Sequence, residues 1–253
     1  MNPNQKELLK QETHAVLRKF FFSTSTLDEC FRDATVGQLA FVQRLAKKEL
    51  VARQISRRHK CVKTAGFPVL KTFDDYDFSG ITFPNLLTKD EMLTLQFIDD
   101  HKSLVWFGGC GTGKTHAMTA LGLMACNKDY KVKFFTVSQL VLLLKKALYD
   151  GTLETFLSIL RAQDVLLLDE LGYIMVDLES AQLLFRVVSE SYERKALIIT
   201  TNLPFSEWGK MFTDDELAAA MIDRIVHYGH LINTGNKDWR LENSLMLDKV
   251  RKK

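Results

Sequence analysis

Short apolar runs alternate with longer amphipathic segments through the second half of the chain. The runs predict strands at 103–107, 130–137, 164–171, 196–204 and 230–234. The segments between them predict helices at 114–129, 138–151, 152–163, 179–195 and 213–229, with Ser138 and Thr213 as N-terminal caps. Nearly all-apolar strands that alternate with helices are typical of a parallel sheet covered on both faces. The pattern therefore predicts an α/β fold with a five-stranded parallel sheet.

The first part of the chain has a different pattern, with helical composition and polar joints. Within it, a loose apolar stripe on one helix is predicted from Leu39, Val42, Leu45 and Leu50. The stretch "TAGFP" at 64–68 ends this helix, and the residues after it are irregular, aromatic and acidic. We therefore expect a helical N-terminal domain at 1–66, a linker at 67–89 and the α/β domain at 90–253.

Positive charge is concentrated near the N-terminus. The whole chain has a net charge of +3, but residues 1–66 hold 13 Lys and Arg against 6 Asp and Glu. This asymmetry favours a polyanionic partner, with a solvated helix face as the alternative. The candidate contacts are Lys47, Lys48, Arg53, Arg57, Arg58 and Lys60. Because no aromatic residues interleave with them, phosphate contacts to duplex DNA are favoured over stacking on single strands.

Composition excludes several classes of protein. The hydrophobic fraction is 46% and the charged fraction 26%, as in an ordinary globular protein. No apolar run is long enough to span a bilayer, and the polar N-terminus does not resemble a signal peptide. The four cysteines form no CxxC pair and have no zinc-site spacing. We therefore expect a cytoplasmic protein with reduced thiols and no membrane partner.

The stretch "WFGGCGTGKTHA" contains the phosphate-loop (P-loop) pattern between a predicted strand and a predicted helix. Its glycines let successive backbone N–H groups point into one concavity that holds phosphate oxygens, and the following helix adds its positive N-terminus. Lys114 is expected to reach the β and γ phosphates, and Thr115 to ligate Mg²⁺. The predicted nucleotide-binding residues are Gly108, Gly109, Cys110, Gly111, Thr112, Gly113, Lys114, Thr115 and His116.

Three polar residues follow buried strands at the edge where ligands bind in open α/β sheets. In "DVLLLDELG", Asp169 is placed to hold Mg²⁺, and Glu170 to orient and deprotonate the attacking water. This pair favours a nucleoside triphosphatase over a small-molecule kinase. Asn202 ends the next predicted strand, where its amide can hold the water and sense the γ-phosphate, with Thr201 as the fallback.

The motifs "GGCGTGKTHAMTALG", "LLLDELGY", "IITTNLPFSEW" and "MIDRIVHYGHLI" occur in the order found in AAA+ ATPases. Together with the basic N-terminal region, they resemble the IstB/DnaC-like branch, and more narrowly the IstB-like helper ATPases of IS21-type insertion sequences. "TTN" stands where "TSN" is common, which keeps the Asn. "WRLENS" replaces the usual tyrosine-arginine ending, so Arg240 is assigned no role.

The resemblance implies an AAA+ core that binds ATP and Mg²⁺ between the subunits of a homo-oligomer. Arg224 matches the family's "DR" position and would act as an arginine finger on the neighbouring subunit. Its alternative is an intramolecular pair with Asp223 or Glu216. About 18 residues follow "HLINTG", too few for the helical lid of many AAA+ proteins. The adenine contacts stay open, with Phe73, Tyr76 and Phe78 as nearby aromatic residues.

The leading functional hypothesis is an ATPase that assembles on duplex target DNA, recruits an IstA-like transposase and disassembles on hydrolysis. One alternative is a DnaC-like loader of a replicative helicase. Another is a DNA-architecture protein for which ATP is only a conformational ligand. A Glu170→Gln variant separates the last of these, because it tests whether turnover is needed.

Overall fold

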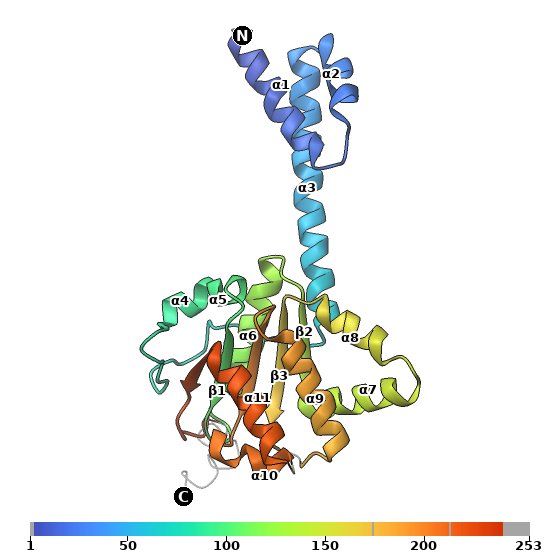
Figure 1. Cartoon of the computed structure of the whole chain (residues 1–253). Coiled ribbons are helices and arrows are strands. Elements are labelled where there is room, and N and C mark those ends of the chain that lie inside the picture. The colour runs from blue at the N-terminus through green and yellow to red at the C-terminus, as the bar shows by residue number, and fades with distance from the viewer. Residues whose placement is uncertain (1–2, 174, 213, 240–253) are drawn as a thin grey trace, which may run out of the picture. The chain divides into compact units, whose positions relative to one another are not determined.

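The computed structural model describes residues 3–173, 175–212 and 214–239 (Figure 1). The chain divides into two compact units, Met1–His59 and Lys60–Lys253. The division falls inside the long helix α3 (Val36–Ala65), whereas the sequence pattern placed the boundary at residue 66, where the helix ends.

The N-terminal unit consists of α1 (Pro3–Arg18), α2 (Thr24–Arg32) and the first part of α3. Its small core is formed by Leu17, Leu27, Phe31, Leu39 and Ala46. The expected apolar stripe on α3 is wrong at Leu45, which is 58% exposed, whereas Ala46 is buried. The reason is helical periodicity: positions three and seven residues after Leu39 share its face, but the position six residues after it does not.

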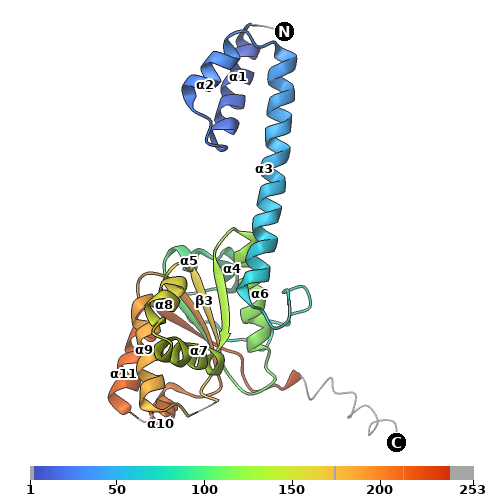
Figure 2. The same cartoon turned by 90° about the vertical axis from the view of Figure 1, so that its right-hand side faces the viewer.

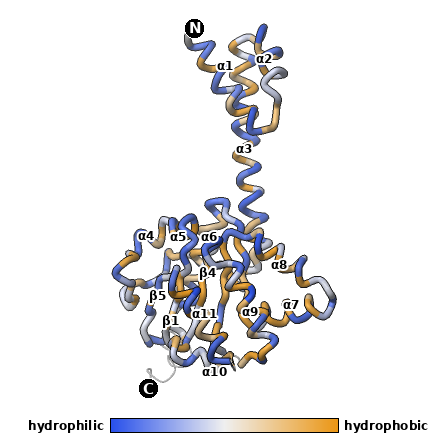
Figure 3. Tube along the Cα trace, viewed as in Figure 1, coloured by the Kyte–Doolittle hydropathy of each residue, from blue (hydrophilic) through white to orange (hydrophobic). Residues whose placement is uncertain are grey.

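The C-terminal unit is built on the predicted parallel sheet. Its strands are β1 (Ser103–Phe107), β2 (Val132–Thr136), β3 (Val165–Leu171), β4 (Ala196–Thr201) and β5 (Gly229–Asn233). They pair in the order β2-β3-β4-β1-β5, and every pairing is parallel. The α/β prediction with a five-stranded parallel sheet is therefore confirmed. Hydrophobic positions run through this sheet (Figure 3).

Helices cover both faces of the sheet (Figure 2). The helices are α4 (Lys89–Thr94), α5 (Gln96–Asp99), α6 (Lys114–Asn127), α7 (Val137–Tyr149), α8 (Leu153–Arg161), α9 (Leu178–Ser191), α10 (Trp208–Phe212) and α11 (Asp215–His227), with a 3₁₀ turn at Phe205–Glu207. Neighbouring β4 residues point to opposite faces: Ile198 packs in the cluster with α6, and Ile199 in the cluster with α7 and α9.

The caps of two helices differ from the predicted ones. α7 begins two residues earlier than expected from Ser138, because Thr136 caps it. Thr136 Oγ1 accepts a hydrogen bond from the Gln139 N–H, and Gln139 Oε1 accepts one from the Thr136 N–H, which together form a capping box. α11 is capped by Asp214, whose carboxylate accepts a hydrogen bond from Leu217 N–H (2.9 Å). The predicted cap Thr213 lies outside the described residues.

The segment expected as a linker packs along the C-terminal unit. It contains no strand apart from a bridge between Thr82 and Asn233. Its aromatic side chains contact the core cluster that contains α6. The approach is close at Gly122 of α6, where a Cβ atom would lie 2.7 Å from the Phe67 ring. Residues 67–89 therefore belong to the body of this unit as far as α4.

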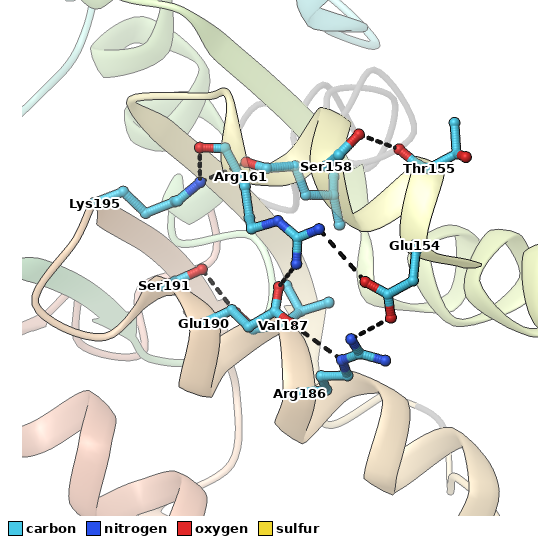
Figure 4. Close-up of polar contacts among 10 residues, drawn as sticks. Glu154, Thr155, Ser158, Arg161, Arg186, Val187, Glu190, Ser191 and Lys195 are labelled. Atoms are coloured by element: carbon cyan, nitrogen blue, oxygen red, sulfur yellow. Dashed lines mark hydrogen bonds and ion pairs between the residues drawn. The ribbon is translucent and has the colours of Figure 1, made fainter. Parts of the chain in front are cut away.

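A polar network joins α8 to α9 (Figure 4). At its exposed side, two arginines and two glutamates alternate: Arg161 and Arg186 each pair with Glu154 and Glu190. At its buried side, Lys195 is only 4% exposed. Its ammonium group donates to the carbonyl oxygens of Leu160 and Arg161, which end α8. A cation there complements the carbonyl groups at the helix C-terminus.

Burial lowers the pKa of Lys195 to about 8, against 10.5 for an ordinary lysine. As the pH rises, the folded state loses this proton first, so the unfolded state binds more protons between these two values and stability rises. We expect the free energy of unfolding of the wild type, minus that of Lys195→Met, to increase by roughly 1–2 kcal/mol between about pH 7 and pH 9.5.

Urea unfolding followed by tryptophan fluorescence measures this difference, because all tryptophans (Trp106, Trp208 and Trp239) belong to the C-terminal unit. Lys146→Met, at an exposed position of α7, is the matched control and should show no such trend. A difference in the free energy of unfolding, wild type minus Lys195→Met, that stays constant or decreases as the pH rises would contradict the expectation.

Candidate functional site

The P-loop occupies the turn between β1 and α6, as its sequence predicted. Gly113, which precedes α6, has a φ of +88°, a conformation that favours glycine. At Gly108 a side chain is excluded by space as well, since a Cβ atom would lie 2.2 Å from Thr234 Oγ1. The loop therefore leads directly into a helix N-terminus, whose free N–H groups and dipole suit an anion.

The residues that follow β5 form hydrogen bonds with the P-loop. These contacts were not predicted from the sequence. Gly109 N–H donates to Gly235 O (2.9 Å), and Trp239 N–H donates to Gly111 O (3.2 Å). The Thr112 and Thr234 hydroxyls are 2.7 Å apart and form a buried hydrogen bond. No local pattern could have revealed these contacts, because they join positions more than 100 residues apart in the chain.

Lys114 is buried, and its ammonium group donates to Gly108 O (2.8 Å) and Gly109 O (2.5 Å) within the loop. Two other predicted loop residues contact neighbouring segments. The Cys110 thiol is exposed and lies 3.3 Å from the Tyr173 hydroxyl. His116 Nε2 lies 2.7 Å from Thr72 O. The positive charge of Lys114 is thus held against the loop backbone by two of the loop's carbonyl groups.

The two predicted carboxylates have different environments. Asp169 is 4% exposed, and its Oδ1 accepts a hydrogen bond from Thr115 Oγ1 (3.0 Å). Glu170 is exposed, with a φ of +63°, at an irregularity in the pairing of β3 with β4. The carboxylate and hydroxyl oxygens of Asp169 and Thr115 are the hard ligands that Mg²⁺ prefers, so this pair fits the ion. Within the described ranges, no group of three or more His, Cys, Asp or Glu residues forms a further metal site.

Asn202 directly follows β4, which pairs with both β3 and β1. Its Oδ1 is buried and has no hydrogen-bond partner in the described part of the chain. The fallback Thr201 is engaged elsewhere, because its hydroxyl accepts from Leu203 N–H (3.1 Å) and donates to Leu203 O. A buried acceptor without a partner carries a desolvation cost, which a bound donor would remove.

A cleft of about 910 Å³ opens beside the P-loop. It is lined by residues of five groups: the P-loop and α6, the β3 and β4 ends, β2, the segment Pro68–Lys71, and Trp239 after β5. The aromatic residues considered near the adenine do not line it. Phe73, Tyr76 and Phe78 pack against one another and the core, and burial raises the pKa of Tyr76.

Arg224 lies apart from the other candidate catalytic residues. Its guanidinium group donates to Ala220 O (2.8 Å), stacks over the Phe185 ring (4.8 Å from the centroid), and has no ion pair with a described residue. It lines a small cavity with Ser103 and Lys195, near the amino ends of β1 and β4. The P-loop and Glu170 lie at the carboxyl ends, so the chain does not bring Arg224 to its own site. Arg240 lies outside the described residues.

The candidate DNA contacts all lie on α3. Lys47, Lys48, Arg57 and Lys60 are exposed, and Arg58 is half-buried. Arg53 is exposed but also bonded within the N-terminal unit, since it pairs with Glu49 (2.8 Å) and covers the Phe20 ring. No helix in the described ranges is both long enough and apolar enough to cross a membrane.

The P-loop, the buried acid at the end of β3 and the strand order define the class: a P-loop nucleotide-binding domain with the AAA+ fold. Two solved structures share this fold. The DnaC helicase loader is 22% identical, with a TM-score of 0.50 over 64% of this chain and 95% of that chain. DnaI is 18% identical, with a TM-score of 0.52 over 69% of this chain and 93% of that chain. At these identities, the likeness concerns the fold alone.

The chain belongs to the family of IstB-like ATP-binding proteins, which matches residues 17–246. It is 34% identical over 228 residues to an ATP-binding protein of insertion sequence IS5376 from Geobacillus stearothermophilus, covering 90% of this chain and 91% of the relative. It is 32% identical over 217 residues to that of IS21 from Pseudomonas aeruginosa, covering 80% and 82%. The resemblance stated from the motifs is therefore confirmed.

We expect Lys114→Met to weaken ATP binding by roughly 10- to 100-fold, the usual effect of losing a charged hydrogen-bond donor to an anion. Titration of a fluorescent ATP analogue measures the Kd. Lys102→Met is the matched control, because Lys102 precedes β1 at the opposite edge of the sheet. Equal affinities for the wild type and Lys114→Met would argue against a phosphate site in this loop.

Proposed function

We propose that this protein is an Mg²⁺-dependent ATPase that helps an insertion sequence to transpose. The observation that carries the proposal is the meeting of the P-loop hydroxyl of Thr115 with the buried Asp169 carboxylate, beside Glu170. Membership of the IstB-like family supports ATP as the nucleotide and a cognate, IstA-like transposase as the partner. The proposed location is the cytoplasm.

The chain's own residues divide the proposed work. Lys114 and the P-loop N–H groups hold the phosphates, and Thr115 with Asp169 holds Mg²⁺, which when bound neutralises phosphate charge. Glu170, whose side chain is exposed toward the cleft, orients the attacking water and takes its proton. Asn202 offers its unpartnered Oδ1 to that water, which supports its role in water positioning.

Arg224 is proposed to complete the site of a neighbouring subunit. Support comes from its position near the amino ends of the strands, away from its own P-loop. In the described chain it forms no ion pair with Asp223 or Glu216, the intramolecular alternatives. An arginine supplied in trans spreads transition-state charge and makes hydrolysis depend on assembly.

Duplex DNA is the proposed platform for this assembly. Exposed lysines and arginines of α3 supply phosphate contacts that do not read sequence. Family membership favours the insertion-sequence role over helicase loading, because the likeness to DnaC and DnaI concerns fold alone. ATP hydrolysis then takes the assembly apart.

Mixing two inactive variants tests the shared site. We expect Glu170→Gln and Arg224→Ala each to bind ATP and each to hydrolyse it poorly. In an equal mixture, about one interface in four combines an intact Glu170 with an intact Arg224 from the other variant, so ATPase activity should partly return. Phosphate release measured against mixing ratio, on duplex DNA, gives the result.

The control is a mixture of Glu170→Gln with Asn202→Ala, which removes two groups of the same chain's site. Glu170 and Asn202 must both come from the same subunit, and neither variant has both. No interface in this mixture is therefore complete, and activity stays low. Recovery in this control, or none in the first mixture, contradicts a finger in trans. If Glu170→Gln supports transposition normally, the protein uses ATP only as a conformational ligand.

Charge removal on α3 tests the DNA platform. The triple change of Lys47, Lys48 and Arg57 to Ala should weaken binding equally for unrelated duplexes. It should also flatten the plot of log affinity against log salt by about 1 for each DNA phosphate that the variant no longer neutralises. Fluorescence anisotropy at several salt concentrations measures both. Lys19→Ala, an exposed lysine next to α1, serves as the control. A triple variant with unchanged salt dependence would rule out these three side chains as phosphate contacts.

A further inference from the structure

Thr200 was assigned no role from the sequence, yet it contacts both acidic residues of the candidate site. It lies on β4 and is 2% exposed. Its hydroxyl donates a hydrogen bond to Asp169 Oδ1 and accepts one from Glu170 N–H (2.9 Å). One hydroxyl group therefore touches the residue proposed to hold Mg²⁺ and the residue proposed to activate water.

The backbone geometry of β3 explains why this hydroxyl is needed. The pairing of β3 with β4 shifts register between Leu168 and Leu171, and Glu170 there has a φ of +63°. This left-handed conformation removes the Glu170 N–H from the regular ladder of the sheet. Thr200 Oγ1 accepts the N–H instead, so the turn that exposes the Glu170 side chain is fixed by a side chain of the adjacent strand.

The same hydroxyl constrains the Asp169 carboxylate. Oδ1 accepts from two hydroxyl groups, those of Thr115 and Thr200. Among the described residues, both side-chain hydrogen bonds of this carboxylate are accepted by Oδ1 and none by Oδ2. The carboxylate is thus oriented by β4 on one side and by the P-loop helix on the other, with one oxygen left for a cation.

We infer that Thr200 is a positioning residue of the ATPase centre: it holds Asp169 for Mg²⁺ and Glu170 for the attacking water. The inference rests on the proposed function. It requires a group that donates and accepts at once, which serine provides and valine does not. Thr201 does not share the role, because its hydroxyl is bonded to Leu203.

The test compares full-length wild type with Thr200→Val and Thr200→Ser. The Kd of a non-hydrolysable ATP analogue is measured in EDTA and in Mg²⁺, and kcat and KM are measured for ATP on duplex DNA. Thr200→Val should keep the Kd in EDTA, because the P-loop is intact. It should lose roughly 10- to 100-fold of the affinity that Mg²⁺ adds, with a comparable fall in kcat. Thr200→Ser should stay within a few-fold of wild type.

Ser191→Ala is the matched control, since it removes another buried hydroxyl of the same unit, one bonded to Val187 O on α9. It should leave the Mg²⁺ effect unchanged. If Thr200→Val does not fold, Thr200→Ala takes its place, because it leaves space for water at the Glu170 N–H.

Two results would overturn the inference: Thr200→Val with a wild-type response to Mg²⁺, or Thr200→Ser as impaired as Thr200→Val. A wild type that shows no Mg²⁺ effect on nucleotide affinity would overturn it too. Failure of the proposed function looks different. If the wild type shows no ATP turnover, the proposed ATPase activity is disproved. The Kd measurements then still decide whether Thr200 supports the Mg²⁺ site.

Discussion

The candidate site depends on one partly buried hydrogen bond, in which Thr115 Oγ1 donates to the buried carboxylate of Asp169 at Oδ1. A carboxylate that is 4% exposed is costly to bury unless donors surround it. Thr115 supplies a donor from the helix that begins in the P-loop, and Thr200 supplies another from β4. The bond therefore joins the phosphate-binding element to the acidic end of β3.

That contact is possible because of the order of the strands. β4 lies between β1 and β3, so the P-loop after β1, the acids of β3 and Asn202 after β4 meet at one edge of the sheet. β5 pairs with the other side of β1, and the residues after it bond to the loop through Thr234 and Gly235. On the β4 side, Gly108 N–H donates to Thr201 O (3.3 Å), so each strand next to β1 holds one side of the same turn.

Local patterns in the sequence were enough to predict the strands, most helices and the P-loop, because these follow from periodicity and from glycine positions. They also led to Asp169, Glu170 and Asn202, since strand ends are visible in the sequence. They could not reveal Thr200, which reads as one more β-branched strand residue until β3 is known to lie beside it. The packing of Phe67 on Gly122 escaped for the same reason, because it joins distant segments.

The separation of Arg224 from Glu170 has a consequence for control under the proposed function. Arg224 lies near the amino ends of the strands, and the candidate nucleotide site lies at their carboxyl ends. Under the proposal, each subunit thus has one half of a site at each end of its strands. If Arg224 acts in trans as proposed, neither half is sufficient, so turnover would require a neighbour in the correct orientation. Duplex DNA that aligns neighbouring subunits would then accelerate hydrolysis without touching the nucleotide. Assembly and its reversal would be coupled through the same arginine.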